Sequence, residues 1–180
     1  MVYVFFANGF EEIEALAVVD VLRRADISTV CVGVGSDVIT GSHGISVICD
    51  AVDSMISADD LIDAVVLPGG MPGTINLEKS PVVSAFVDSM AQSGKLICAI
   101  CAAPSILGHK GLLKGKKATC FPGFESELEG AEVSDNFVVE DGNIITAKGM
   151  GSAVKFGLAI GARLVGEEKM KKIEESLQCS

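Results

Sequence analysis

The chain has 180 residues, of which 24 are Asp or Glu and 14 are Lys or Arg, so its formal net charge at pH 7 is −10. With 49% apolar residues and a mean hydropathy of +0.47, the composition predicts one globular domain over residues 1–180 and excludes intrinsic disorder. The sequence pI of about 4.6 argues against nucleic acid as a partner, because phosphate recognition depends on clustered Lys and Arg.

The sequence contains neither a membrane-span pattern nor an export signal. No apolar run approaches the roughly 18 residues that a membrane-spanning helix needs. The apolar start at residues 1–6 has no basic residues and no cleavage pattern, so we expect a chain that begins at Met1, binds no membrane and stays in the cytoplasm. Six cysteines lie mostly in apolar segments, as free thiols of a reducing compartment do, and we expect Cys179 to be exposed on the tail.

In chain order, short apolar runs alternate with segments of helical spacing. A strand is predicted at residues 2–6, and a helix with an acidic first turn follows near residues 13–22. Further strands are predicted at residues 27–34, 63–67 and 95–100, with pairs of short strands within 38–48 and 137–146. Further helices are predicted over residues 58–62, 81–93, 102–107, 152–165 and 167–177.

This alternation predicts an α/β fold. Strands that are apolar on both faces and separated by helices form a mostly parallel sheet covered on both sides. In such a sheet, functional residues gather where the strands reach their carboxyl ends.

Cys101 is the first candidate for chemistry. It stands where the strand at 95–100 ends and a helix begins, and its small neighbours Ala99, Ala102 and Ala103 suit a sharp elbow. The positive end of the following helix is expected to lower the thiol pKa and favour the nucleophilic thiolate. The alternative is that Cys101 is one more small core residue, since free cysteine is often buried.

Cys98 and Cys101 also form a C-x-x-C pattern, but a redox or zinc role is not favoured. Residues three apart on a strand point to opposite faces and lie about 10 Å apart, beyond the reach of a disulfide. His43 and His109 do not stand at the spacing of a second zinc ligand pair. The chain has no phosphate-loop motif, and the segment that starts at Gly149 departs from the dinucleotide fingerprint, so we expect no metal and no cofactor.

Glu14 and the glycine-rich turn at 68–73 are further candidates. Glu14 stands at the start of the first helix, where it either acts as a general acid or base or is one of three carboxylates favoured by the helix dipole. The turn exposes backbone N–H groups that suit an oxyanion or phosphate cradle.

Five motifs, in colinear order over nearly the whole chain, resemble the ThiJ/PfpI superfamily. They are similar to those of the branch that contains the Parkinson's-disease-associated deglycase and bacterial ThiJ-like proteins. The motifs are NGFEEIE at 8–14, DVLRRA at 20–25, VLPGG at 66–70, AICAAP at 99–104 and GMG at 149–151. The resemblance implies a flavodoxin-like three-layer α/β sandwich, a mostly parallel central sheet and a homodimer.

The resemblance also implies roles for individual residues. Cys101 corresponds to the reactive, oxidation-sensitive cysteine, and Glu14 to a carboxyl that lies against its sulfur. A protonated Glu14 would donate a hydrogen bond to a thiolate or sulfinate. The backbone N–H groups of Gly70 and Ala102 would form an oxyanion hole.

More distant positions are implied in the same way. Arg24 and the loop of Gly149, Met150 and Gly151 match the rim of the pocket, and we expect the loop to come from the partner subunit. Cys49 matches a cysteine near the dimer interface.

The sequence departs from several relatives of this superfamily. Ala102 follows the cysteine where the protease branch has histidine, which argues against a peptidase. Phe121 stands where the human deglycase has a histidine, so Glu14 is left as the proton carrier. A His-x-Glu pair, which class I glutamine amidotransferases need, follows neither His43 nor His109.

The resulting hypothesis is a cofactor-independent cysteine enzyme of small dicarbonyls. It would act as a glutathione-independent glyoxalase or as a deglycase of protein or nucleotide adducts, with methylglyoxal converted to lactate. The alternative hypothesis is an oxidative-stress sensor or redox-regulated chaperone, in which Cys101 is oxidised and no substrate is turned over.

Overall fold

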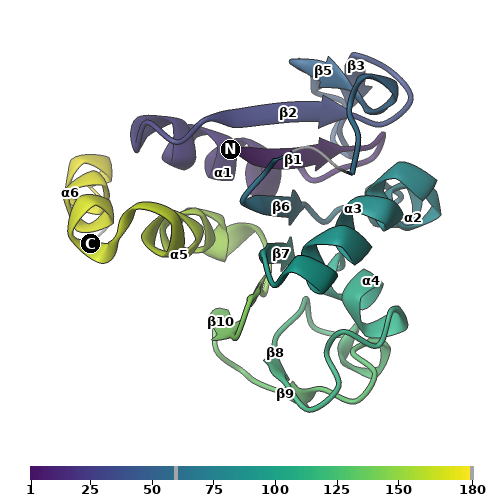
Figure 1. Cartoon of the computed structure of the whole chain (residues 1–180), viewed down its shortest axis with the longest axis vertical. Coiled ribbons are helices and arrows are strands. Elements are labelled where there is room, and N and C mark those ends of the chain that lie inside the picture. The colour runs from purple at the N-terminus through teal and green to yellow at the C-terminus, as the bar shows by residue number, and fades with distance from the viewer. Residues whose placement is uncertain (59–60, 179–180) are drawn as a thin grey trace.

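The computed structural model describes residues 1–58 and 61–178, and its centre is a seven-stranded sheet with the order β10-β11-β7-β6-β1-β2-β5 (Figure 1). The neighbouring strands of this sheet are parallel except β10, which is antiparallel to β11. The strands are β1 Val2–Phe6, β2 Thr29–Gly33, β5 Ala51–Val52, β6 Ala64–Leu67, β7 Leu96–Ile100, β10 Val138–Asp141 and β11 Ile144–Ala147. This arrangement confirms the predicted mostly parallel sheet.

Two small ribbons and six α-helices complete the described part of the chain. The ribbons pair β3 Val38–Thr40 with β4 Ser46–Ile48, and β8 Lys117–Ala118 with β9 Glu132–Val133. The α-helices are α1 Glu12–Arg24, α2 Gly73–Lys79, α3 Pro81–Ser93, α4 Pro104–His109, α5 Ala153–Val165 and α6 Glu167–Leu177. Short 3-10 turns lie at η1 Asp53–Met55, η2 Glu125–Glu127 and η3 Met150–Ser152. No α-helix among the described residues is long and apolar enough to cross a membrane.

The helices cover both faces of the sheet and produce a three-layer sandwich. In β1, Val4 and Phe6 join the core beneath α1 and α5, whereas Tyr3 and Phe5 join the core beneath α2, α3 and α4. Successive strand residues point to opposite faces, so a strand that is apolar throughout needs a helical layer on each side. The sequence prediction of the three-layer fold is therefore confirmed.

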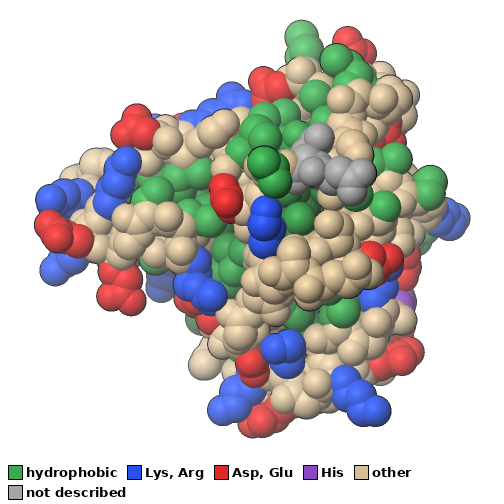
Figure 2. Space-filling view, in the orientation of Figure 1, with side chains coloured by type: hydrophobic (Ala, Val, Ile, Leu, Met, Phe, Trp, Pro, Cys, Tyr) green, Lys and Arg blue, Asp and Glu red, His purple; other side chains and the backbone are tan. Residues whose placement is uncertain are grey.

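Local sequence signals explain why several predicted bounds are confirmed. Ser80 caps α3 by accepting a hydrogen bond from the Val83 N–H, Pro81 occupies the first turn, and Gly94 ends the helix with a φ of +66°. Gly166 separates α5 from α6. Figure 2 shows acidic and basic side chains together over α6, at the left of the view, as expected of a charged terminal helix.

Other parts of the fold differ from the prediction. α2 was not predicted, because it is short and its first turn lies in the glycine- and proline-rich segment. The two-residue strands β5, β8 and β9 are too short to show an apolar pattern. The helix expected at 58–62 includes residues outside the described ranges, and its described residues Leu61 and Ile62 are not helical. Cys179 also lies outside the described ranges.

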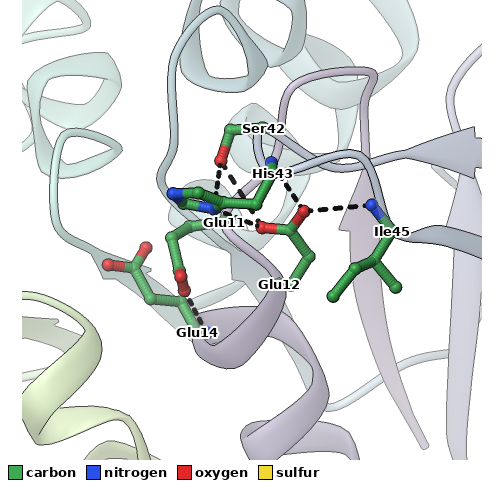
Figure 3. Close-up of polar contacts among 6 residues, drawn as sticks. All are labelled: Glu11, Glu12, Glu14, Ser42, His43 and Ile45. Carbon is green, nitrogen blue, oxygen red and sulfur yellow. Dashed lines mark hydrogen bonds and ion pairs between the residues drawn. The ribbon is translucent and has the colours of Figure 1, made fainter.

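A buried carboxylate fastens the β3–β4 ribbon to the start of α1 (Figure 3). Glu12 accepts hydrogen bonds from the His43 backbone N–H at 2.7 Å and from the Ile45 N–H at 3.4 Å, and its other oxygen lies 2.9 Å from the His43 ring Nδ1. Burial opposes ionisation of Glu12, but these hydrogen bonds outweigh it and lower its pKa to about 2. A Cβ at Gly41 would stand 2.3 Å from a Glu12 oxygen, so this turn requires glycine.

We expect Glu12→Gln to lower the free energy of unfolding by about 2 kcal/mol at pH 7, because charge-assisted hydrogen bonds to the turn become neutral ones. The folded-state pKa of Glu12 lies below its ordinary 4.5, so its contribution is present above pH 4.5 and is lost as the pH falls towards about 2. Urea denaturation at pH 7 and pH 3 measures this loss. Glu129→Gln, at an exposed position, is the control, and an equal effect of Glu12→Gln at both pH values would contradict the assignment.

Candidate active site

Cys101 occupies a strained elbow at the carboxyl end of β7. Its φ is +66°, a left-handed conformation that costs a residue with a Cβ about 1–2 kcal/mol. Two hydrogen bonds hold this conformation: the Cys101 N–H donates to the Ala147 carbonyl at 2.9 Å, and the Phe121 N–H donates to the Cys101 carbonyl at 2.8 Å. The thiol is partly exposed, whereas the preceding strand residues are buried.

Glu14, in the first turn of α1, meets the Cys101 thiol. Its side chain is buried, forms a hydrogen bond with the thiol and accepts one from the Gly69 N–H at 2.9 Å. A Cβ at Gly69 would lie 2.5 Å from the Cys101 Cβ and 2.6 Å from Glu14 Oε2, so the carboxyl and thiol meet only because residue 69 is glycine. Figure 3 shows the Glu14 carboxyl pointing away from the Glu12 and His43 side chains.

The surroundings of Glu14 favour its protonated form. Burial is the main cause that raises its pKa from 4.5 to about 7, and the nearby charge of Glu11 adds to the effect. Hydrogen bonds from the Cys101 thiol and from the backbone of Gly69 and Met150 act in the opposite direction. Glu14 therefore titrates near neutral pH, where an acid–base group is most effective.

The thiol pKa is raised, which contradicts the expected lowering by the following helix. Burial is the largest cause, and the charge of the Glu14 carboxylate is the next, so that the Cys101 pKa rises to about 12. The backbone N–H groups of Gly70 and Ala102 lower it, but by less. Because α4 is short and begins only at Pro104, its dipole does not outweigh burial beside a carboxylate. The thiol proton therefore needs an acceptor, and Glu14 is in contact with it.

Gly70 and Ala102 both bring their N–H groups to the Cys101 sulfur. Gly70 has a φ of +92°, and a Cβ there would stand 2.3 Å from the Glu11 nitrogen. The turn after β6 therefore reaches the elbow only with glycine at this position. Two donors converging on one sulfur suit a negative charge on that atom.

The loop of Gly149, Met150 and Gly151 lies against Glu14 in the same chain. The Met150 backbone forms a hydrogen bond with the Glu14 carboxyl. The expectation that this loop comes from a partner subunit is wrong for this contact. The loop belongs to the same chain because β11 pairs with β7, so the loop after β11 and the elbow after β7 are neighbours at one edge of the sheet.

Arg24 and Cys49 are not brought to Cys101 within the chain. Arg24 ends α1, about 15 Å along the helix from Glu14, and its Nε lies 2.6 Å from an Asp20 oxygen. Cys49 is buried beyond the end of β4, and burial raises its pKa to about 11.

The remaining described cysteines do not share the surroundings of Cys101. The five described cysteines are free. Burial raises the pKa of Cys98 well above its ordinary value and that of Cys120 to about 11. Glu14 is not among the groups that act on either thiol.

Glu11, Glu12 and His43 form one group of metal-type donor atoms among the described residues. Glu11 accepts the Glu14 backbone N–H at 2.7 Å and caps α1, while Glu12 holds the His43 turn. These hydrogen bonds account for the positions of both carboxylates.

An aromatic cleft beside the elbow was missed by sequence reasoning. It is lined by Phe121, Phe137 and Met150, among others. From the sequence, Phe121 stands out only because it replaces a histidine, and no contact with a substrate was predicted for it. Phe137 could have been recognised as an aromatic residue that directly follows the polar residues Asp135 and Asn136.

Known proteins are similar to this chain in both sequence and fold. The model of the DJ-1/PfpI family matches residues 1–163. Protein dj-1beta of Drosophila melanogaster is 37% identical over 177 residues, which cover 97% of this chain and 94% of that protein. The crystal structure of Drosophila melanogaster DJ-1beta matches with a TM-score of 0.95 at 35% identity, over 99% of this chain and 97% of the other.

Two further relatives are informative for the site. The glutathione-independent glyoxalase DJR-1.2 of Caenorhabditis elegans is 31% identical over 170 residues, covering 93% of this chain and 89% of that protein. The structure of oxidized Toxoplasma gondii DJ-1 matches with a TM-score of 0.93 at 34% identity, over 98% of this chain and 96% of the other. The chain therefore belongs to the DJ-1/PfpI family, in its DJ-1-like branch.

Proposed function

We propose that the protein is a cofactor-independent enzyme of small dicarbonyls, a glutathione-independent glyoxalase or deglycase with Cys101 as nucleophile. The observation that carries the proposal is the buried Glu14 carboxyl, with a pKa of about 7, in contact with a thiol at a strained elbow. The C. elegans relative named as a glutathione-independent glyoxalase supports the same class of reaction. The substrate is a free dicarbonyl such as methylglyoxal, or its adduct with an amino acid or nucleotide.

The reaction begins with transfer of the thiol proton. Glu14 takes this proton as Sγ of Cys101 attacks the aldehyde carbon, and the carbonyl electron pair moves to oxygen, which Glu14 then protonates. The N–H groups of Gly70 and Ala102 stabilise the negative charge first on sulfur and then on the adjacent oxygen. The product of this step is a hemithioacetal.

Glu14 next moves a proton between the two carbons of the substrate. It removes the proton from the carbon bound to sulfur, which gives an enediolate, and returns that proton to the neighbouring carbon. The hydroxyl proton of the first carbon passes to the oxygen of the second. The result is a thioester, and water hydrolyses it to lactate and the free thiol. Methylglyoxal and water thus become lactate with no external oxidant or reductant.

A second candidate function is oxidation sensing at the same cysteine. Peroxide would convert the Cys101 thiol to a sulfinate, and a protonated Glu14 would hold it through a hydrogen bond. The favouring observations are the raised pKa of Glu14 and the similarity to oxidized Toxoplasma gondii DJ-1.

The proposal includes a homodimer in the cytoplasm. Large apolar side chains on α1 and on the β3–β4 ribbon are exposed, including Ile13, Ile45 and Ile48, and Cys49 lies at the end of that ribbon. Arg24 can line the rim of the pocket only in the other subunit of such a dimer, because the length of α1 separates it from Glu14 of its own chain.

Cys101→Ala is expected to reduce glutathione-free conversion of methylglyoxal to lactate by at least about 10³-fold, because no other described thiol meets Glu14. Glu14→Gln is expected to reduce it by about 10²- to 10⁴-fold, since the amide cannot carry the proton. Lactate formation by purified, reduced protein measures both losses. The matched control is Cys98→Ala, which removes a buried thiol within β7 and should keep the activity. Turnover by Cys101→Ala would refute the mechanism.

The pH dependence of turnover tests the role of Glu14. Because its carboxylate must accept the first proton and its pKa is about 7, kcat/KM should rise with pH up to about 7 and then level off. Below this value, the rate should fall about tenfold per pH unit. The residual rate of Glu14→Gln should lack this limb, and a wild-type profile that is flat from pH 5 to 8 would exclude Glu14 as the acceptor.

Oxidation sensing has its own test. Mass spectrometry after mild peroxide treatment should find two added oxygens on Cys101 and none on the buried Cys98. Equal oxidation of the two cysteines would contradict selective sensing.

A further inference from the structure

A cleft of about 330 Å³ opens beside the Cys101–Glu14 pair. Its walls include Phe121, Pro122, Phe137, Lys148 and Met150. Three of these side chains are large, apolar and exposed: Phe137 at 64%, Met150 at 55% and Phe121 at 47% of their surface. Apolar surface gathered in a concave site is typical of a surface that a ligand covers.

Residues that line the cleft also contact the reacting groups. The Phe121 N–H donates to the Cys101 carbonyl, which ties one wall to the elbow. From a Cβ placed on Gly149, the Phe121 ring is 3.2 Å away and Glu14 Oε1 is 3.7 Å away. The Met150 backbone bonds to Glu14, while its side chain lines the cleft. A substrate bonded to Cys101 therefore has this apolar surface beside it.

Lys148 is the charged residue among the described walls of the cleft. Lys148 Nζ lies 3.3 Å from an Asp135 oxygen and 6.0 Å from the centre of the Phe137 ring. The amine is thus already paired with a carboxylate and stacked over an aromatic ring. Ser152 also lines the cleft, but its hydroxyl donates to the Gly149 carbonyl at 2.8 Å. The other described wall residues offer apolar side chains or backbone, which suits an uncharged group.

We propose that this cleft binds an aryl or bulky alkyl substituent of the dicarbonyl substrate. The proposal rests on the proposed function and narrows its substrate class to glyoxals, or their adducts, whose second carbonyl carries a large apolar group. An apolar cavity of roughly 150 Å³ holds a benzene molecule, so this cleft has room for a ring. A methyl group would leave most of the aromatic surface in water.

Phenylglyoxal and methylglyoxal are the two substrates that test the cleft. Wild type should have a kcat/KM for phenylglyoxal, measured as mandelate formation in the absence of glutathione, about tenfold above that for methylglyoxal. Phe137→Ala should lower the ratio of kcat/KM for phenylglyoxal to that for methylglyoxal about tenfold, mainly through a higher KM for phenylglyoxal, while Phe137→Leu retains most of the preference. Phe137 is largely exposed, so its replacement leaves the core intact.

A matched control is Val165→Ala, which trims another exposed apolar side chain at the far end of α5. It should leave both substrates unaffected. An unchanged substrate ratio in Phe137→Ala, or an absence of preference in wild type, would overturn the proposal while leaving the dicarbonyl activity in place.

A binding measurement separates the cleft from the activity. The probe is 2-hydroxyacetophenone, an aryl ketone without the aldehyde, with hydroxyacetone as its small counterpart. In NMR titrations of wild type, the aryl probe alone should shift the ring signals of Phe121 and Phe137 and the methyl signal of Met150. If wild type turns over neither glyoxal, the proposed function fails, but the NMR shifts still test whether the cleft binds an aryl group. Absence of these shifts would overturn the proposal for the cleft.

Discussion

The contact between the Glu14 carboxyl and the Cys101 thiol constrains the segments around it. Both groups are removed from most of the solvent, and this burial raises the pKa of the Glu14 carboxyl and that of the Cys101 thiol. Such a pair is compatible with folding only if backbone donors surround it. The Gly69, Gly70, Ala102 and Met150 N–H groups serve this purpose, and two of these positions tolerate no side chain.

The sheet order explains how four distant segments reach one point. β11, β7, β6 and β1 are consecutive neighbours and run parallel, so their carboxyl ends lie at one edge. These ends deliver, in the same order, the 149–151 loop, the Cys101 elbow, the Gly69–Gly70 turn and the start of α1 with Glu14. The site is thus a product of topology, and the buried Glu12 adds the β3–β4 ribbon to its border.

The sequence allowed much of the fold and the two central residues to be predicted. Strand 2–6 and helices 81–93 and 167–177 have the predicted bounds because apolar runs, a Ser80–Pro81 start and single glycines mark their ends. The predicted direction of the Cys101 pKa was wrong, since the burial of the thiol, which is the largest cause of its raised pKa, arises only in three dimensions. Phe137 was missed for a related reason: an exposed aromatic residue looks like any other until its neighbours across the fold are known.

The same electrostatics links the two proposed chemistries of Cys101. Because burial disfavours charge on either group, the pair carries at most one negative charge near neutral pH, and this charge lies on the Glu14 carboxylate, whose pKa is the lower of the two. In the proposed turnover, that charge would move from Glu14 to sulfur as the proton moves from sulfur to Glu14, and both would then return. A sulfinate would hold the charge on sulfur permanently, and its repulsion would raise the Glu14 pKa further and keep the carboxyl protonated. Oxidation would then remove the nucleophile and the proton acceptor in one event, so the two proposed chemistries would exclude one another at this site.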